Sequence, residues 1–341
     1  MSEPLLEVKG LKVRFTTEDG VVRAVDGVDF ELERGKVLGI VGESGSGKSV
    51  TAMTMIGLTR APNTAFEGEV AYKGQDLLAM SERRLRDVRG NEIAMIFQDP
   101  MTSLNPVYRV GDQIVEAILT HDSVGKRVAR QRAVELLREV GIPNPNNRAN
   151  DYPHQFSGGM RQRAMIAMAI ACNPDVLIAD EPTTALDVTI QAQIIELIDK
   201  LKDDFNSSVI LITHDLGVVA DVADEILVMY AGRVVERGSK RSLFYDPQHP
   251  YTWGLLGSIP RLDRPKGSRL ASIKGAPPSL INLPQGCKFR PRCPHAFDRC
   301  VGEPELANRV EERRHLDRCW LGVDEKRSVR SATIKGEVAT A

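Results

Sequence analysis

The stretch Gly42-Glu-Ser-Gly-Ser-Gly47-Lys48-Ser49 decides how the rest of the chain is interpreted. It matches the pattern G-x-x-x-x-G-K-[ST] at every position. The apolar residues 37–41 before it predict a buried strand, and a helix is expected to begin at Lys48. In this context the glycines let backbone N–H groups turn toward phosphate oxygens, and the helix N-terminus attracts the same anion. The stretch therefore predicts a nucleoside triphosphate site.

Two residues of this phosphate loop have specific predicted tasks. Lys48 is expected to reach the β- and γ-phosphates, and the Ser49 hydroxyl is expected to coordinate Mg²⁺. The predicted nucleotide-binding residues of the loop are Gly42, Glu43, Ser44, Gly45, Ser46, Gly47, Lys48 and Ser49.

A second apolar strand, residues 176–179, ends in the two carboxylates Asp180 and Glu181. Ligands of open α/β sheets bind at the carboxyl ends of the strands, so this pair is expected beside the phosphate loop. Asp180 is predicted to hold Mg²⁺, and Glu181 to polarise the attacking water as a general base. The two motifs together predict hydrolysis of the bound nucleotide.

The pattern around these motifs predicts an α/β fold with a doubly wound parallel sheet. Residues 176–179, 190–201 and 209–212 alternate as strand, helix and strand, which is typical of such sheets. Residues 5–41 predict antiparallel strands around a turn at Asp19-Gly20. The other predicted elements are helices at 126–140 and 160–171 and a hairpin at 226–236.

Composition limits the classes of function. The chain has 45 basic and 46 acidic residues, a formal charge of −1, which argues against a nucleic-acid partner. Residues 165–172 are its longest strongly apolar stretch, far short of the ~20 residues that a membrane-spanning helix needs. The opening Met1-Ser-Glu-Pro has no feature of a secretion signal. We expect a chain that stays in the cytoplasm and meets a membrane only as a peripheral protein.

Further segments resemble motifs of ABC-type ATPases. Ser157-Gly158-Gly159-Met160-Arg161-Gln162 is similar to the signature sequence of that family, although Met160 replaces the usual Gln and Phe156 the usual Leu. Gln98 resembles the Q-loop glutamine, His214 the switch histidine, and Thr184-Ala-Leu-Asp187 the D-loop. The order and spacing of these motifs match the family, and the resemblance covers about residues 5–240.

This resemblance implies an ABC nucleotide-binding domain at residues 5–245. Its RecA-like parallel sheet would carry an antiparallel β-subdomain and a helical insert, residues 99–156, which docks on membrane subunits in the family. Two cassettes would dimerise head to tail, so that the signature helix faces the γ-phosphate on the opposite subunit. The family roles carried over are Ser157, Gly158, Gly159 and Asp187 for nucleotide binding, Gln98 for Mg²⁺ and water, His214 for the γ-phosphate, and Phe15 for stacking on adenine.

The rest of the chain is similar to ATPase subunits of oligopeptide and dipeptide importers. The similar segments are His249-Pro-Tyr251-Thr, Phe97-Gln-Asp-Pro-Met-Thr-Ser-Leu-Asn-Pro106 and Tyr152-Pro-His-Gln-Phe-Ser-Gly-Gly. The resemblance implies ATP-driven peptide import from the cytoplasmic face of the bacterial inner membrane. The implied partners are two permease subunits, a second and paralogous ATPase in a heterodimer, and a peptide-binding protein.

Two alternatives to peptide import stay open. The same machinery could carry nickel or glutathione, because the binding protein and the membrane subunits choose the cargo. A soluble ABC protein that acts on ribosomes or DNA is less favoured, because the chain has a single cassette and a near-neutral charge.

A C-terminal extension is predicted at residues 246–325, followed by a loose polar tail at 326–341. The extension contains Cys287, Cys293, Cys300 and Cys319, and Pro294 follows the second of these. Compact zinc sites favour C-x₂-C pairs, whereas this looser spacing with a Cys-Pro step favours a [4Fe–4S] cluster. Some members of the importer subgroup carry such a cluster. Zinc is the second interpretation, and four unliganded thiols are the third.

Overall fold

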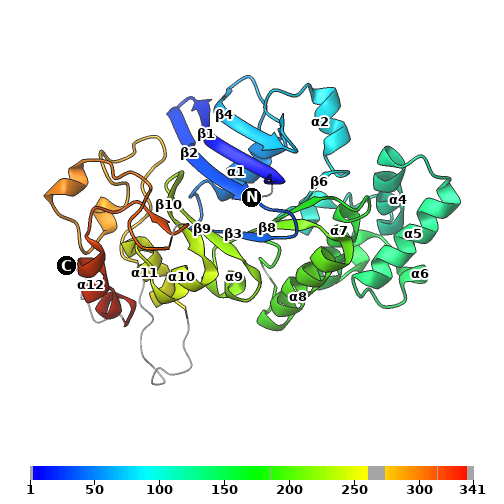
Figure 1. The fold of residues 1–341 in the computed structure, drawn as a ribbon. Helices are drawn as coiled ribbons and strands as arrows, with labels where there is room; N and C mark the ends of the chain where they lie inside the picture. Colours follow the sequence, from blue (N-terminus) through cyan, green and yellow to red (C-terminus); the bar gives the residue numbers. More distant parts are fainter. Residues whose placement is uncertain (1–2, 185, 260–272, 313, 336–341) are drawn as a thin grey trace. The chain divides into compact units, whose positions relative to one another are not determined.

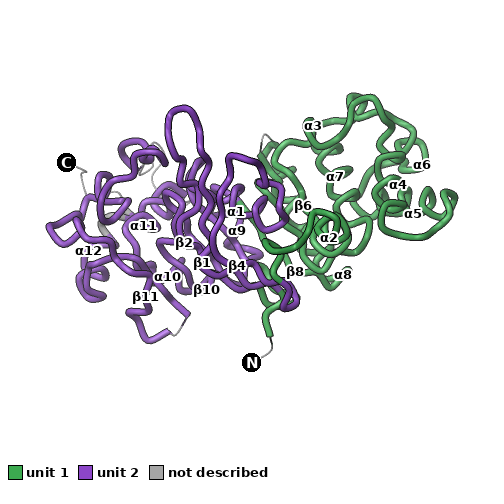
Figure 2. The backbone as a smooth tube through the Cα atoms, turned by 90° about the horizontal axis from the view of Figure 1, so that it is seen from above, with its two compact units in different colours: residues 1–5, 32–37, 76–212 green, residues 6–31, 38–75, 213–341 purple. Residues whose placement is uncertain are grey.

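The computed structural model describes residues 3–184, 186–259, 273–312 and 314–335 (Figure 1). They divide into two compact units (Figure 2). Unit 1 comprises residues 1–5, 32–37 and 76–212, and unit 2 comprises residues 6–31, 38–75 and 213–341. Among the described residues, no helix is both long enough and apolar enough to cross a bilayer.

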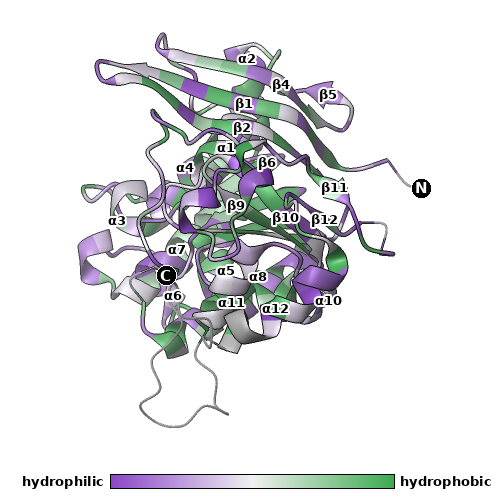
Figure 3. Ribbon diagram, turned by 90° about the vertical axis from the view of Figure 1, so that its left-hand side faces the viewer, coloured by the Kyte–Doolittle hydropathy of each residue, from purple (hydrophilic) through white to green (hydrophobic). Residues whose placement is uncertain are grey.

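Unit 2 begins with an antiparallel layer. Its strands β1 (Leu6–Thr17), β2 (Gly20–Leu32), β4 (Thr64–Tyr72) and β5 (Gln75–Asp76) lie in the order β2-β1-β4-β5. Strand β1 buries Leu6, Val8, Leu11 and Val13 and leaves intervening polar residues at least partly exposed. In Figure 3 hydrophobic and hydrophilic colours alternate along this strand. This alternation is typical of a sheet with one covered face, and it confirms the strands predicted around Asp19-Gly20.

The central strands of unit 2 position the phosphate loop. Strand β3 (Val37–Val41), buried along its length, pairs in parallel with β9 (Glu225–Tyr230). Strand β9 turns at Ala231 and Gly232 and pairs antiparallel with β10 (Arg233–Ser239), so the hairpin predicted at 226–236 is confirmed. The chain leaves β3 through the phosphate loop and enters α1 (Lys48–Met55), which begins at the residue that the sequence predicts.

The C-terminal part of unit 2 consists of short elements and contains a small hydrophobic core. Trp253, Cys319 and Leu321 form this core, and Val329 and Ile334 pack against it. Its elements are α9 (Leu216–Val222), α10 (Lys240–Tyr245), α11 (Pro250–Gly257), the 3₁₀ turns η2 (Arg290–Arg292) and η3 (Asp298–Val301), β11 (Ala307–Asn308), β12 (Leu316–Asp317) and α12 (Val323–Lys335).

Helix α12 corrects the prediction of a loose polar tail from residue 326. Lys326 is completely buried and its ammonium group lies 2.7 Å from the carboxylate of Asp317 in β12. A buried ion pair of this kind cannot be recognised from composition, because the partner lies on another element. Residues 336–341 of the predicted tail lie outside the described part of the chain.

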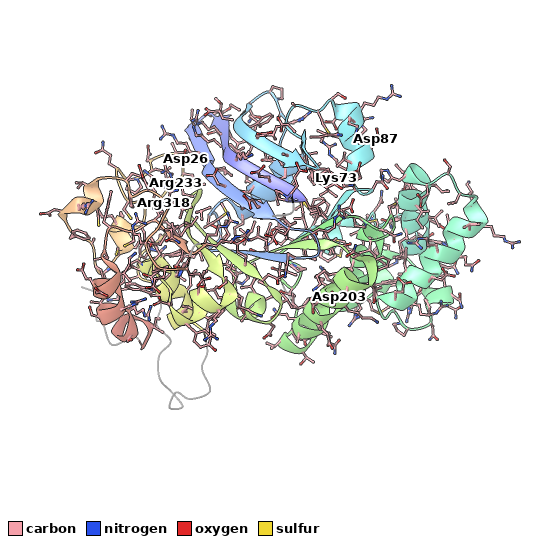
Figure 4. The ribbon with its side chains drawn as sticks, viewed as in Figure 1. Asp26, Lys73, Asp87, Asp203, Arg233 and Arg318 are labelled. Carbon is pink, nitrogen blue, oxygen red and sulfur yellow. The ribbon has the colours of Figure 1, made fainter. Side chains whose placement is uncertain are left out.

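Charged pairs also connect strands of unit 2. The guanidinium group of Arg233 in β10 donates two hydrogen bonds, of 2.7 and 3.0 Å, to the carboxylate of Asp26 in β2. Arg318 donates from Nε to the carbonyl oxygen of Val234, the next residue of β10. Figure 4 shows the three labelled side chains in one region. These contacts connect β10 with β2 and with the segment that contains Arg318.

Unit 1 has a parallel sheet and a helical insert. Strand β7 (Val176–Asp180) is buried along its length and pairs in parallel with β6 (Ile93–Ile96) on one side and β8 (Ser208–Thr213) on the other. Its helices are α2 (Glu82–Val88), α3 (Pro100–Ser103), α4 (Val110–His121), α5 (Lys126–Glu139), α6 (Pro145–Arg148), α7 (Gly158–Ala169) and α8 (Val188–Phe205), with the 3₁₀ turn η1 (Pro153–Gln155). Residues 99–156, all of them described, contain helices and no strand. The predicted α/β class is confirmed.

Candidate active site

The phosphate loop of unit 2 has the backbone conformation that its glycines predict. Gly47 has a φ of 101° in the left-handed region, and a Cβ there would collide with the carbonyl oxygen of Ala24. A Cβ at Gly42 would likewise collide with the carbonyl oxygen of Met229 in β9. Any larger residue at either position would displace the loop from these neighbours.

Lys48 lies within this loop rather than pointing away from it. Its side chain is 4% exposed, and its ammonium group donates to the carbonyl oxygens of Gly42 and Glu43 at 2.8 and 3.0 Å. The hydroxyl group of Ser46 is buried with no hydrogen-bond partner among the described residues. An ammonium group and an unpaired hydroxyl inside a ring of backbone are the groups that a phosphate ligand would use.

A backbone hydrogen bond links residues 43 and 46 within the phosphate loop. The Ser46 N–H donates to the carbonyl oxygen of Glu43 at 3.2 Å, and Gly232 then donates its N–H to the carbonyl oxygen of Ser46 at 3.0 Å. The loop is thus attached to the β9–β10 hairpin as well as to β3 and α1.

The predicted catalytic carboxylates lie at the end of β7 in unit 1. Asp180 is the last residue of the strand and is 4% exposed. Glu181 follows it with a φ of 46°, the left-handed region that non-glycine residues rarely adopt. Such a conformation costs on the order of 1–3 kcal/mol and is concentrated at functional sites.

Two polar side chains donate hydrogen bonds to the carboxylate of Glu181. The Gln98 amide nitrogen donates to Oε2 of Glu181 at 3.0 Å, and the Thr184 hydroxyl donates to the same oxygen at 2.9 Å. The Glu181 N–H donates to the carbonyl oxygen of Ile212 in β8. The predicted Q-loop residue and the predicted base are therefore in direct contact. Thr184 was predicted only as part of the D-loop, although its place three residues after Glu181 was a usable signal.

The signature and D-loop residues each begin a helix of unit 1. Ser157 is the N-cap of α7, and its hydroxyl accepts a bond of 3.4 Å from the Met160 N–H. Asp187 caps α8 in the same way, accepting from the Ile190 N–H at 3.0 Å. The capping geometry explains the residue types at both positions. Gly158 and Gly159 form the first turn of α7, where the helix dipole favours an anion.

The remaining predicted residues lie in unit 2. His214 is exposed in the turn between β8 and α9, next to Asp215, whose side chain caps α9. Phe15 is near the end of β1, half-buried, and opposite Thr64 of β4. The adenine-stacking role of Phe15 and the phosphate contact of His214 stay predictions.

At the four cysteines of the extension, the structure differs from the metal site that the sequence predicts. In the described part of the chain, no group of three or more His, Cys, Asp or Glu side chains is placed to hold a metal ion, so the predicted [4Fe–4S] cluster and the zinc alternative are not supported. Burial raises the pKa of Cys293 and Cys319 to about 12, so both are neutral thiols in this structure. Cys172, which lies outside the extension, is also a free thiol.

Residues of the extension reach the phosphate loop, which the sequence did not reveal. Arg292 lies 2.5 Å from the carboxylate of Glu43, and the Tyr251 hydroxyl accepts a hydrogen bond from the Glu43 N–H. From the sequence alone, Tyr251 is only part of a family motif. A contact across more than 200 positions leaves no local pattern from which it could be found.

Comparisons with known proteins agree with these motifs. Residues 25–184 match the family model described as ABC transporter, and residues 235–300 match the model described as oligopeptide/dipeptide transporter, C-terminal region. The oligopeptide transport ATP-binding protein OppD of Salmonella typhimurium is 53% identical over 89% of this chain and 90% of its own length. The dipeptide transport ATP-binding protein DppD of Bacillus subtilis is 52% identical over 94% of this chain and 95% of its own.

Solved structures are similar over the cassette. The chain resembles the ATP-binding cassette MJ0796, solved as a dimer in a post-hydrolysis state with ADP and Pi, with a TM-score of 0.62 and 27% identity. The match covers 69% of this chain and 99% of that one. The chain belongs to the ABC transporter ATP-binding proteins that carry the oligopeptide/dipeptide C-terminal region, and it is an ATPase of that family.

Proposed function

We propose that this chain is the ATP-hydrolysing subunit of a transporter that imports di- and oligopeptides. The observation that carries the proposal is identity above 50%, along nine-tenths of the chain, to proteins named for peptide transport. The C-terminal match at residues 235–300 supports the same cargo class over nickel or glutathione, because that family model is itself described by peptide transport.

The role proposed for each residue of the site follows from its chemistry. The loop from Gly42 to Ser49 binds the phosphates of ATP, with Lys48 on the β- and γ-phosphates. Ser49 and Asp180 are the residues that would supply oxygen ligands to Mg²⁺, which that ion prefers. Glu181 takes a proton from the attacking water. Gln98 orients Glu181, a role supported by the 3.0 Å bond between them.

The proposed partners are two permease subunits, which the helical insert at residues 99–156 contacts, and a second, paralogous ATPase. A peptide-binding protein delivers the cargo from the other side. The chain then works as a peripheral protein at the cytoplasmic face of the inner membrane. The exposed Met101, Val107 and Tyr108 of the insert support a docking role for this segment.

The cargo is tested with the assembled transporter. We expect ATP hydrolysis by the complex in proteoliposomes to rise several-fold when the peptide-loaded binding protein is added, and labelled peptide to accumulate only with ATP. Addition of nickel or glutathione with the same binding protein is the control and should leave hydrolysis at its basal rate. If nickel or glutathione stimulated hydrolysis and peptides did not, the transporter would carry that compound instead of peptides.

We keep the [4Fe–4S] cluster as a proposal based on ligand chemistry alone. Four cysteines lie within residues 287–319, and the Cys287 N–H donates to the carbonyl oxygen of Cys300 at 3.1 Å. Neutral thiols buried together become thiolates only if a cation compensates their charge. A cluster would provide that charge and cross-link a segment with few core residues.

Anaerobic purification distinguishes the three interpretations of the cysteines. We expect brown protein with broad absorption near about 400 nm and about four irons per chain. Replacement of Cys287, Cys293, Cys300 or Cys319 by Ser should remove the colour, whereas Cys172→Ser is the matched control and should keep it. Stoichiometric zinc without iron would support the second interpretation. Metal-free protein with four titratable thiols would support the third.

A further inference from the structure

We propose that Arg292 and Tyr251, both from the C-terminal extension, position the phosphate loop for ATP by holding Glu43 at its carboxylate and at its backbone N–H. The two residues would thereby set the nucleotide affinity of a cassette whose loop is far away in sequence. The inference rests on the proposed role of the loop in binding ATP, and it adds two positioning residues to that site.

The contact between Arg292 and Glu43 has the geometry of a strong ion pair. Two guanidinium nitrogens of Arg292 donate to the two carboxylate oxygens of Glu43, at 2.5 and 3.0 Å. The Arg292 side chain is 4% exposed and that of Glu43 is 29% exposed, so water screens the pair only from the Glu43 side. Bidentate pairs of this type fix direction as well as distance.

A second contact fixes the backbone at the same residue. The Glu43 N–H donates to the Tyr251 hydroxyl at 2.8 Å, and the Tyr251 side chain is completely buried. Glu43 is thus held through both its main chain and its side chain. It is also the residue whose carbonyl oxygen accepts from Lys48 and from the Ser46 N–H. A shift of Glu43 would therefore move the groups proposed to contact phosphate.

The two holding residues are themselves rigidly supported. Tyr251 packs against Tyr230 and Phe289, with ring centroids 4.7 and 5.4 Å away, and Tyr230 is the last residue of β9. Arg292 also donates to the carbonyl oxygens of Lys274 and Ile273, at 3.0 and 3.2 Å. Side chains with so few alternative positions lose little entropy when the loop binds a ligand.

Arg292 also compensates the negative charge of Glu43. Glu43 places a carboxylate in a loop that is proposed to bind a polyanion, and an uncompensated carboxylate would repel the phosphates. The guanidinium group of Arg292 cancels that charge at hydrogen-bond distance. The arrangement makes the extension part of the electrostatic environment of the nucleotide.

Arg292 also connects the cysteine segment with the loop. It is the last residue of the turn η2, and Cys293 follows it directly. Backbone bonds from Arg290 to Cys287, from Arg292 to Phe289 and from Cys293 to Arg290 form successive turns between the first two cysteines. The conformation of the segment from Cys287 to Cys293 therefore determines where the Arg292 guanidinium lies.

The test measures MgATP binding to the isolated full chain, together with thermal unfolding. We expect Arg292→Met to weaken MgATP binding about tenfold, the size expected for loss of a charge-assisted pair. Tyr251→Phe should weaken it several-fold, because the Glu43 N–H loses its acceptor. In the assembled complex the same variants should raise the KM for ATP with little change in kcat. Arg290→Met, two residues earlier in the same turn, is the matched control and should bind like the wild type.

A double-mutant cycle separates positioning from general stability. If Arg292 acts through the Glu43 carboxylate, Glu43→Gln should restore most of the affinity that Arg292→Met loses. The proposal would be overturned if folded Arg292→Met bound MgATP as tightly as the wild type. It would also be overturned if the losses of affinity caused by Arg292→Met and Glu43→Gln were additive in the double variant. If Arg292→Met does not fold, Arg292→Lys in the wild-type and Glu43→Gln backgrounds decides the question in the same way. Failure of the wild type to bind MgATP would instead refute the proposed function of the loop.

Discussion

Replacement of Glu181 by Gln is expected to slow ATP hydrolysis by at least ~10²-fold, the scale of losing a general base. Gln keeps the size of the side chain and can still contact the Gln98 and Thr184 side chains, so the geometry at the end of β7 should survive. An amide cannot accept the proton from water. ATP binding should remain, and the closed nucleotide-bound dimer should accumulate. Single-turnover hydrolysis and nucleotide binding in the assembled transporter measure the two effects separately.

Lys48→Ala is the contrasting variant for this experiment. It removes the ammonium group that lies inside the phosphate loop, so nucleotide affinity should fall before any effect on the chemical step is seen. A steady-state turnover near that of the wild type in Glu181→Gln would contradict the assignment of the base, or would identify this site as the non-hydrolysing one of a mixed pair.

The motifs that bind and hydrolyse nucleotide were accessible from the sequence because each is local. A G-x-x-x-x-G-K-S loop needs its glycines where the backbone has a positive φ or a close neighbour, and Gly47 beside Ala24 meets both conditions. Ser157 and Asp187 are helix caps, whose residue types follow from hydrogen bonding within one turn. The strand that ends in Asp180 is a short apolar run, which is also a local signal.

The parts that sequence reasoning missed depend on contacts between distant segments. From the sequence, Lys326 is predicted to be a solvated residue of a polar tail. In the structure it is a buried residue of α12, paired with Asp317. From the sequence, Arg292 would be predicted to be an exposed basic residue near the cysteines. Only the fold brings it to Glu43. Neither pair has a periodicity or spacing that distinguishes it from exposed charges, which are far more common.

The other large expected effect concerns the signature residue Ser157. In the proposed head-to-tail dimer with a paralogous ATPase, the N-terminus of α7 would face the γ-phosphate on the partner's loop rather than on its own. Ser157→Arg would fill that space and is expected to reduce hydrolysis at the partner's site about 10²-fold, as for other removed transition-state donors. Nucleotide binding at this chain's own Lys48 should be unchanged. Vanadate trapping of labelled nucleotide, read on each subunit, measures the two sites separately.

The local role of Ser157 requires its own control, because its hydroxyl also caps α7. Asp is an equally good N-cap, so Ser157→Asp should keep the helix and the unfolding temperature while its negative charge repels the γ-phosphate. Loss of trapping on the partner in both variants, with a stable fold in the Asp variant, would separate the effect across the dimer from loss of the cap. Loss confined to this chain's own site would mean that the signature acts within one subunit. A fully active homodimer of this chain with the native permeases and no second ATPase would refute the heterodimer.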